Sequence, residues 1–142
     1  MREGKVDFKP LYEAHKRQMV SAGCDVDRLI EVRHEMHANA EGAFEEHWTH
    51  KKIRDTLLSF EGFKESDMKV CAKTGLVVDI KGTDWTGPAS KQTGGVKTVA
   101  IRADMDGLPI PENNPELPYK TKTDWAHMCG HDGHMAMLLA AA

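Results

Sequence analysis

Three potential metal ligands stand on alternate positions near the end of the chain. His127, Cys129 and His131 fall within residues 125–142, which read WAHMCGHDGHMAMLLAAA. In an extended backbone, residues two apart point to the same side, so all three side chains could face one ion. A cysteine binds metal as its thiolate, and thiolate together with imidazole suits zinc, with cobalt, nickel and manganese as alternatives. The spacing therefore predicts a metal site.

Two aspartates supply a second set of candidate groups. Asp104 and Asp106 follow the apolar run at residues 96–103, in the sequence RADMDGLP. A carboxylate at a strand exit can bind a metal directly, or it can hold the far nitrogen of a metal-bound histidine. Aspartate is also common in turns, so these two residues taken alone do not indicate a site. Because a Cys-Gly-His motif follows on a neighbouring segment, we favour a metal site.

These groups alone are too few for catalysis. A catalytic zinc site usually has three protein ligands and one open position. The sequence offers two or three ligands and no convincing glutamate to act as a general base. If the chain catalysed hydrolysis by itself, Glu112, Glu116 or a partner chain would have to complete the site.

The elements that must position these groups follow from periodicity and turn residues. We expect helices and strands at these positions: helices 11–21, 26–38, 49–61 and 135–142, and strands 68–72, 76–80 and 96–103. Residues 82–95, rich in Gly, Thr, Ser and Pro, predict a loop. Thr49 and Asp132 are the expected N-caps of the third and fourth helices, and the chain should turn into the fourth at Gly130 or Gly133.

A histidine pair on the second predicted helix allows two interpretations. His34 and His37 lie three residues apart, so they could act together as metal ligands. The alternative is a satisfied polar contact near the edge of the core. We favour the polar contact, because it is the more common role of a histidine on a helix.

Composition limits the function classes. With 142 residues the chain forms one domain at most, and its 40% apolar and 29% charged residues suit a soluble globular protein. A net charge of −3 argues against a nucleic-acid partner. Three widely spaced cysteines are not a disulfide framework and indicate a reducing compartment, the cytoplasm. We find neither a signal peptide nor an apolar run that could span a membrane.

The end of the sequence predicts a fragment. The chain stops inside an apolar helix, without a C-cap glycine or a polar last turn. We therefore expect residues 1–25 to form an N-terminal extension and residues 26–142 to form the first part of a larger catalytic domain.

Two long motifs carry a resemblance to a known family. They are residues 99–110 (VAIRADMDGLPI) and residues 129–139 (CGHDGHMAMLL), with shorter similarities at residues 33–37, 44–46 and 117–119. Over residues 29–142 the chain resembles the metal-dependent amidohydrolases and metallopeptidases that include aminoacylases, hippurate hydrolases and auxin-conjugate hydrolases. The resemblance implies an α/β fold in which helices flank a mixed sheet. This chain would supply the first portion of a zinc-peptidase-like catalytic domain, with the lid domain absent.

The resemblance also implies a site. In this family two divalent metal ions, zinc, manganese, cobalt or nickel, are bridged in part by a cysteine. By resemblance, Cys129 and His131 are metal ligands and Asp104 lies beneath the site in the second shell. His127 and Asp106 are further candidates that are not carried over as ligands. The general-base glutamate and the remaining ligands are expected beyond residue 142, so no catalytic residue is assigned within the chain.

The implied reaction is hydrolysis of the amide bond of an N-acyl amino acid or a related amino-acid conjugate. The parent protein would bind that substrate and could form a homodimer through the lid domain. The rival hypothesis is a truncated, non-catalytic protein that binds metal or acts as an interaction module. Neither the acyl group, the amino acid nor the metal follows from the sequence.

Overall fold

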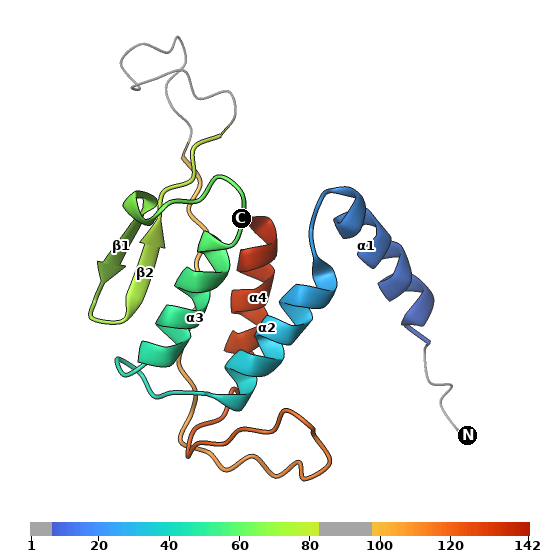
Figure 1. The fold of residues 1–142 in the computed structure, drawn as a ribbon. Coiled ribbons are helices and arrows are strands. Elements are labelled where there is room, and N and C mark those ends of the chain that lie inside the picture. Colours follow the sequence, from blue (N-terminus) through green and yellow to red (C-terminus); the bar gives the residue numbers. More distant parts are fainter. Residues whose placement is uncertain (1–6, 83–97) are drawn as a thin grey trace.

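The computed structural model describes residues 7–82 and 98–142 of the chain. Figure 1 shows their elements, which are, in chain order, α1 (Lys9–Ser21), α2 (Val26–Ala38), α3 (His47–Leu58), the 3₁₀ turn η1 (Glu65–Asp67), β1 (Met68–Cys71), β2 (Gly75–Val78) and α4 (His131–Ala141). Helices are thus combined with a two-stranded antiparallel sheet.

The core lies where α2, α3 and α4 meet the hairpin. It consists of apolar side chains that recur at helical spacing: Leu29, Val32, Met36, Ile53, Leu57, Met135 and Leu139. Helices α2 and α4 form the most extensive contact between elements. Burying a side chain of this size contributes about 1.5–3 kcal/mol, so this cluster is the main source of stability. The helix expected at residues 26–38 is confirmed, because α2 has those bounds.

Helix α3 begins earlier than its sequence predicted. Thr49 was expected to cap the helix, but it lies inside α3 and is buried. The cap comes instead from Glu41, whose carboxylate accepts hydrogen bonds from the backbone N–H of Trp48 at 2.9 Å and of Thr49 at 2.8 Å. A carboxylate at the start of a helix satisfies unpaired N–H groups and favours the helix dipole. The prediction of Thr49 as the N-cap was wrong because the capping group stands several residues upstream.

The two predicted strands at residues 68–72 and 76–80 are confirmed as a hairpin. Strands β1 and β2 pair antiparallel, with Met68 opposite Val78 and Cys71 opposite Gly75. The turn holds Ala72 at φ 48° and Lys73 at φ 74°, a region that favours glycine or asparagine. A contact at the start of α3 holds this turn, because Thr74 donates its hydroxyl hydrogen to the buried carboxylate of Glu46, the residue before α3.

The predicted strand at residues 96–103 is not a strand where the structure describes it. Residues 96 and 97 lie outside the described residues, as does nearly all of the loop predicted at 82–95. Residues 98–103 are irregular, with Val99 83% and Ile101 67% exposed. A strand exists through a ladder of hydrogen bonds to a neighbour. Within the described residues no strand pairs with this segment, although Ala103 and Met105 pack against the core.

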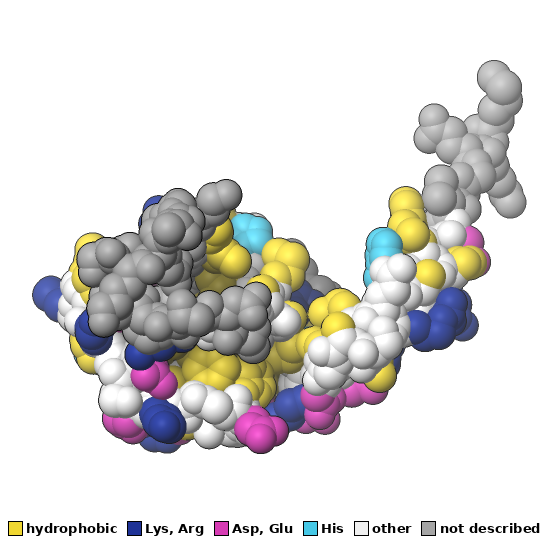
Figure 2. Space-filling view, turned by 90° about the horizontal axis from the view of Figure 1, so that it is seen from above, with side chains coloured by type: hydrophobic (Ala, Val, Ile, Leu, Met, Phe, Trp, Pro, Cys, Tyr) yellow, Lys and Arg dark blue, Asp and Glu magenta, His cyan; other side chains and the backbone are white. Residues whose placement is uncertain are grey.

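Helix α1 stands apart from the body. It was expected at residues 11–21 and begins two residues earlier, with Pro10 in its first turn. Figure 2 shows it as an arm that reaches away from the remaining helices, and none of its residues is buried. Among the described residues, no helix is long and apolar enough to cross a membrane.

Candidate metal centre

The segment that carries Cys129 is a turn and not an extended strand. The backbone N–H of Gly130 donates to the carbonyl oxygen of His127 at 3.1 Å, which closes a turn around Met128 and Cys129. As a result His127 points inward and is only 5% exposed, whereas Cys129 is exposed. The alternation that predicted three ligands on one side therefore fails for this pair, because it assumed an extended backbone.

Gly130 then directs the chain into α4. It has φ 75°, a conformation that glycine adopts without strain, and the prediction of a turn at Gly130 is confirmed. Its carbonyl oxygen accepts from the N–H groups of Gly133 at 3.0 Å and His134 at 3.1 Å. Asp132 was predicted to be the N-cap, and that prediction was wrong. Gly130 occupies the cap position, and Asp132 lies in the first turn of the helix, 1% exposed.

His131 is held in a way that suits a metal ligand. Its Nδ1 lies 2.9 Å from the backbone oxygen of Asp106 and 3.2 Å from the Oδ1 of the same residue. Both atoms are acceptors, so the proton sits on Nδ1 and the lone pair is left on Nε2. Metal-binding histidines commonly donate their other N–H to a carbonyl or carboxylate in this manner. The imidazole is partly exposed.

The two aspartates of the RADMDGLP segment have different surroundings. Asp104 forms an ion pair with Arg102, and no hydrogen bond joins it to His131 among the described residues. Asp106 is the aspartate of this segment that contacts His131. The role of Asp104 beneath the site stays a prediction, and the geometry assigns the holding of His131 to Asp106.

An ionic cluster with three buried members, His37, Glu112 and Asp132, and a partly exposed Arg33 lies on the other side of the same turn. Four side chains form it, and we call them the Asp132 clamp: Arg33, His37, Glu112 and Asp132. The Oδ2 of Asp132 accepts from Arg33 Nε at 3.0 Å and lies 2.9 Å from His37 Nδ1. His37 Nε2 lies 3.2 Å from Glu112 Oε1, and the other oxygen of Glu112 accepts from the N–H of Thr121 at 2.7 Å. One imidazole therefore bridges two carboxylates.

The clamp keeps both carboxylates ionised. Burial raises the pKa of Asp132. The hydrogen bond from His37 and the charge of Arg33 lower it by more than burial raises it, so the pKa lies below its ordinary value. For Glu112 burial also acts upward, and the hydrogen bonds from Thr121 and His37 bring the pKa below its ordinary value. Glu112 is thus committed to the clamp and is not placed as a general base. Glu116, the other alternative, is an exposed residue of the same loop.

The histidine pair on α2 makes polar and aromatic contacts. His37 belongs to the clamp, and His34 stacks on Tyr119 with ring centroids 3.6 Å apart. Burial lowers the pKa of His34, which keeps its ring neutral near pH 7. These contacts match the polar-contact interpretation, and sequence reasoning had not connected His37 with Asp132.

His127 is the unusual residue of the region. Both of its ring nitrogens are buried without a hydrogen-bond partner in the described part of the chain, and so is Oδ1 of Asp132. Burial lowers the pKa of His127, so the ring is neutral. A buried imidazole without partners costs stability, which makes His127 a candidate for a function other than packing.

The donors fit a metal in type but do not complete a site. Cys129 and His131 are the thiolate and imidazole ligands that zinc and similar ions prefer. Within residues 7–82 and 98–142, no three His, Cys, Asp or Glu side chains come together in a group that could hold a metal ion. The described residues therefore supply part of a coordination shell.

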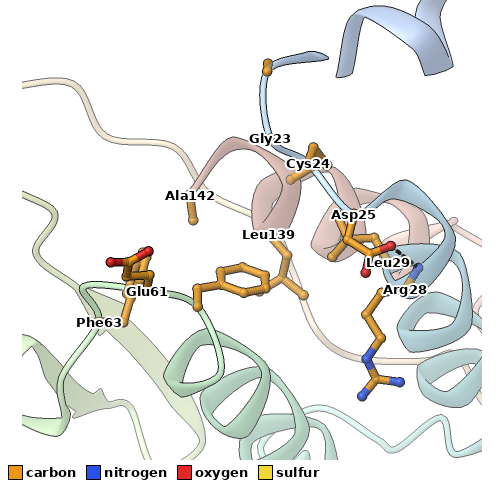
Figure 3. A pocket seen from close by; sticks show the side chains of 12 residues that line it. Gly23, Cys24, Asp25, Arg28, Leu29, Glu61, Phe63, Leu139 and Ala142 are labelled. Carbon is orange, nitrogen blue, oxygen red and sulfur yellow. Dashed lines mark hydrogen bonds between the residues drawn. The ribbon is translucent and has the colours of Figure 1, made fainter. Parts of the chain in front are cut away.

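A pocket lies at the opposite end of α4 from these donors. It has a volume of about 320 Å³ and is lined mainly by apolar groups of the α1–α2 junction, the chain after α3 and the end of α4. Figure 3 shows Leu139 and Ala142 from the end of the chain at this pocket, together with Cys24 and Phe63. Because the candidate ligands are absent from its lining, this pocket does not belong to the metal site.

Comparison with known proteins identifies relatives of this segment. Residues 100–142 match the family model described as Peptidase family M20/M25/M40. N-acetylcysteine deacetylase of Bacillus subtilis is 38% identical over 120 residues, covering 81% of this chain and 27% of that protein. Hippurate hydrolase of Campylobacter jejuni is 40% identical over 114 residues, covering 78% of this chain and 26% of that protein. The chain spans about a quarter of the length of these curated relatives.

A solved structure extends the likeness to the fold. The crystal structure of the Bacillus subtilis YxeP protein, described as a dinuclear metal binding peptidase from the M20 family, matches with a TM-score of 0.60 and 36% identity. The match covers 80% of this chain and 28% of that chain. The expected α/β fold, as a first portion of such a catalytic domain, is confirmed.

Proposed function

We propose that the chain is the N-terminal part of a metal-dependent amidohydrolase, because residues 100–142 match the model of peptidase family M20/M25/M40. The proposed reaction is hydrolysis of the amide bond of an N-acyl amino acid or a related amino-acid conjugate. The names of the two curated relatives, a deacetylase of N-acetylcysteine and a hydrolase of hippurate, support this substrate class. The observation that carries the proposal is His131, whose Nδ1 is held by Asp106 beside the exposed Cys129.

Each residue of the centre has a proposed role. Cys129 and His131 would hold metal, and Asp106 would fix the tautomer and orientation of His131. Asp104 keeps, by resemblance, a supporting role beneath the site. Bound divalent ions would polarise the scissile carbonyl and lower the pKa of a water molecule. The general base is proposed to lie outside these 142 residues, because Glu112 is engaged by His37 and Thr121.

The cofactor and partners are proposed on the same basis. We propose two divalent ions, supported by the description of YxeP as a dinuclear protein, with zinc, manganese, cobalt and nickel as the candidates. A homodimer formed through a lid domain is part of the proposal for the whole protein. Three cysteines that remain free support action in the reducing cytoplasm.

One observation favours a second function. The described residues bring no three ligand side chains together, so the chain by itself could be a non-catalytic metal-binding or interaction protein. The two functions share metal binding and differ in turnover. The amidohydrolase part should support turnover when the remaining domain is supplied, whereas the non-catalytic protein should not.

A metal-binding experiment tests the ligands first. Equilibrium dialysis of the 142-residue chain against Zn²⁺, followed by elemental analysis, should give bound zinc that Cys129→Ser sharply reduces. Cys71→Ser is the matched control, because Cys71 is also an exposed free cysteine but lies on the hairpin. Equal zinc content in both variants would contradict the assignment of Cys129.

A chimera tests the reaction. The chain would replace the matching first quarter of Campylobacter jejuni hippurate hydrolase, and hippurate hydrolysis would be measured. Turnover that Cys129→Ser abolishes and Cys71→Ser preserves is the expected result. A folded, metal-loaded chimera without turnover would favour the non-catalytic function.

A further inference from the structure

We propose that Asp132 is a positioning residue: helix α2 holds its carboxylate, and this contact fixes the turn that carries Cys129 and His131. The inference rests on the proposed metal-binding function and deepens it. It assigns a task to the contacts of Arg33 and His37 with Asp132, which supply no metal ligand. Three features support it, namely the contacts of Asp132, the geometry of its neighbours and the loop joined to the same imidazole.

The carboxylate of Asp132 is fixed from one direction by one helix. Arg33 and His37 lie four residues apart on α2, so they face the same side of that helix. Both reach the same oxygen, at 3.0 Å and 2.9 Å. A carboxylate that is 1% exposed cannot exchange these donors for water. Asp132 therefore has a single orientation relative to α2.

The fixed orientation of Asp132 constrains the two candidate ligands because they are close to it in the chain. Asp132 follows His131 directly and comes three residues after Cys129, and Gly130 links the turn to α4 through its left-handed backbone. His131 is anchored independently, by Asp106 on the 98–107 segment. Two adjacent residues are thus fixed to two different parts of the fold. Their backbone has little freedom to rotate, which fixes the start of α4 and limits the positions that the turn with Cys129 can take.

The clamp also reaches the loop at residues 109–125. Glu112 contacts the second nitrogen of His37 and accepts from the N–H of Thr121, and Tyr119 packs with its ring edge toward His37 at a centroid distance of 5.5 Å. The Glu112 contact is one step further from the ligands than that of Asp132. Loss of Glu112 should loosen the loop while Arg33 and His37 still hold Asp132, which makes Glu112→Gln an internal control.

A purely structural cluster would lower stability without a specific effect on the metal. Cobalt(II) distinguishes the two, because a bound thiolate gives a charge-transfer band and the ligand-field bands report the geometry around the ion. The experiment therefore uses Co²⁺ alone as the probe, titrated into the full 142-residue chain. Unfolding midpoints are measured on the same samples without metal.

The expected result separates Asp132 from its controls. Asp132→Asn should weaken Co²⁺ binding on the order of 10–100-fold, the usual effect of a group that orients a ligand, and should reduce the thiolate band. The Co²⁺ affinity of Glu112→Gln should stay within about threefold of that of the unaltered chain, a change much smaller than the one expected for Asp132→Asn. Leu57→Ala is the control for stability. It removes a core side chain on α3, so it should destabilise the fold as Asp132→Asn does, but it leaves the clamp intact. Its affinity and spectrum should not change.

Each remaining outcome decides the matter. If Asp132→Asn binds Co²⁺ like the unaltered chain, or if Leu57→Ala loses as much affinity at equal stability, the positioning role is overturned and the metal ligands stand. If the unaltered chain gives no thiolate band, the proposed function and this inference both fail. If Asp132→Asn does not fold, Arg33→Gln replaces it. This change removes one of the two α2 donors to Asp132, so Co²⁺ binding should weaken, and binding equal to that of the unaltered chain would overturn the positioning role.

Discussion

Helix α2 and the segment at residues 98–130 owe their conformations to different kinds of interaction. The helix follows from local sequence, with Asp25 accepting from the N–H of Arg28 at its start and an apolar stripe facing the core. The segment contains no helix and no paired strand beyond one isolated bridge between Leu108 and Ala126. It nevertheless carries most of the candidate site.

Long-range contacts take the place of secondary structure in that segment. The N–H of Gly107 donates to the carbonyl of Glu41 at 2.7 Å, and the N–H of Lys122 donates to the carbonyl of Ala38 at 2.9 Å. The hydroxyl of Thr123 donates to the carbonyl of Ala40 at 2.6 Å. The chain leaving α2 therefore serves as the support on which the segment is laid. Helix α2 and the chain that follows it thus position the candidate site through a segment, residues 98–130, that has almost no regular secondary structure.

Removing the contact that His37 of α2 makes with Glu112 of the segment and with Asp132 should cause the largest loss of unfolding free energy. His37→Leu removes the imidazole that bridges Asp132 and Glu112. It leaves Asp132 with Arg33 alone, and Glu112 with the N–H of Thr121. Loss of one member of a buried ionic network costs about 3–5 kcal/mol. Urea unfolding should report a decrease of this size, and a change below about 1 kcal/mol would mean that the clamp does not stabilise the fold.

A close approach between the two regions gives the next effect. A Cβ at Gly42 would lie 2.5 Å from the Trp125 ring, whereas one at Gly82 would meet nothing. Overpacking of this kind costs about 1–3 kcal/mol. Gly42→Ala should therefore lower the unfolding free energy by that amount in the urea assay, with Gly82→Ala as the control. Equal stability of the two variants would show that Trp125 moves freely away.

The acid dependence of stability should sharpen the comparison further. The pKa of Glu112 lies below its ordinary value of 4.5, so its interactions stabilise the fold above that pH and are lost as the pH falls through the folded-state pKa. The unaltered chain should lose unfolding free energy below about pH 4.5 more steeply than Glu112→Gln. Glu116→Gln, an exposed change in the same loop, should keep the slope of the unaltered chain. Parallel curves for all three would contradict the role of Glu112.

The smallest effect is expected at His127. Because both ring nitrogens lack partners in the described part of the chain, replacing the ring by an apolar side chain removes no hydrogen bond found there. His127→Leu should leave the thermal midpoint unchanged or raise it slightly, in contrast to His37→Leu. The same variant should retain metal, since His127 faces inward while Cys129 is exposed. A loss of metal equal to that of Cys129→Ser would make His127 a ligand.

Sequence patterns predicted the elements whose determinants are local. Both bounds of α2 and the hairpin at Met68–Val78 follow from periodicity and turn residues. The capping of α3 by Glu41 and the inward position of Asp132 did not follow. In each case the deciding partner is distant, and Arg33 and Asp132 stand 99 positions apart. The spacing of Arg33 and His37 on one helix face was the signal that could have suggested a shared acidic partner.

The candidate site was predicted in composition but not in arrangement. Cys129 and His131 were named from their spacing and from the family resemblance, and their metal-binding role stays a proposal. The contact of Asp106 with His131 was not predicted, because the resemblance gave the supporting role beneath the site to Asp104, a role that stays a prediction. The inward turn of His127 could not be seen, since an extended backbone had been assumed where a turn at Gly130 occurs.

Nitrogen-15 NMR of the histidine side chains during a Zn²⁺ titration tests the central claim most directly. His131 should keep its proton on Nδ1, where Asp106 accepts it, and its Nε2 resonance should move as zinc binds. Cys129→Ser should reduce that movement at the same zinc concentration. An unshifted His131, or zinc bound at Nδ1 with the Asp106 hydrogen bond lost, would contradict the assignment of this turn as a metal centre.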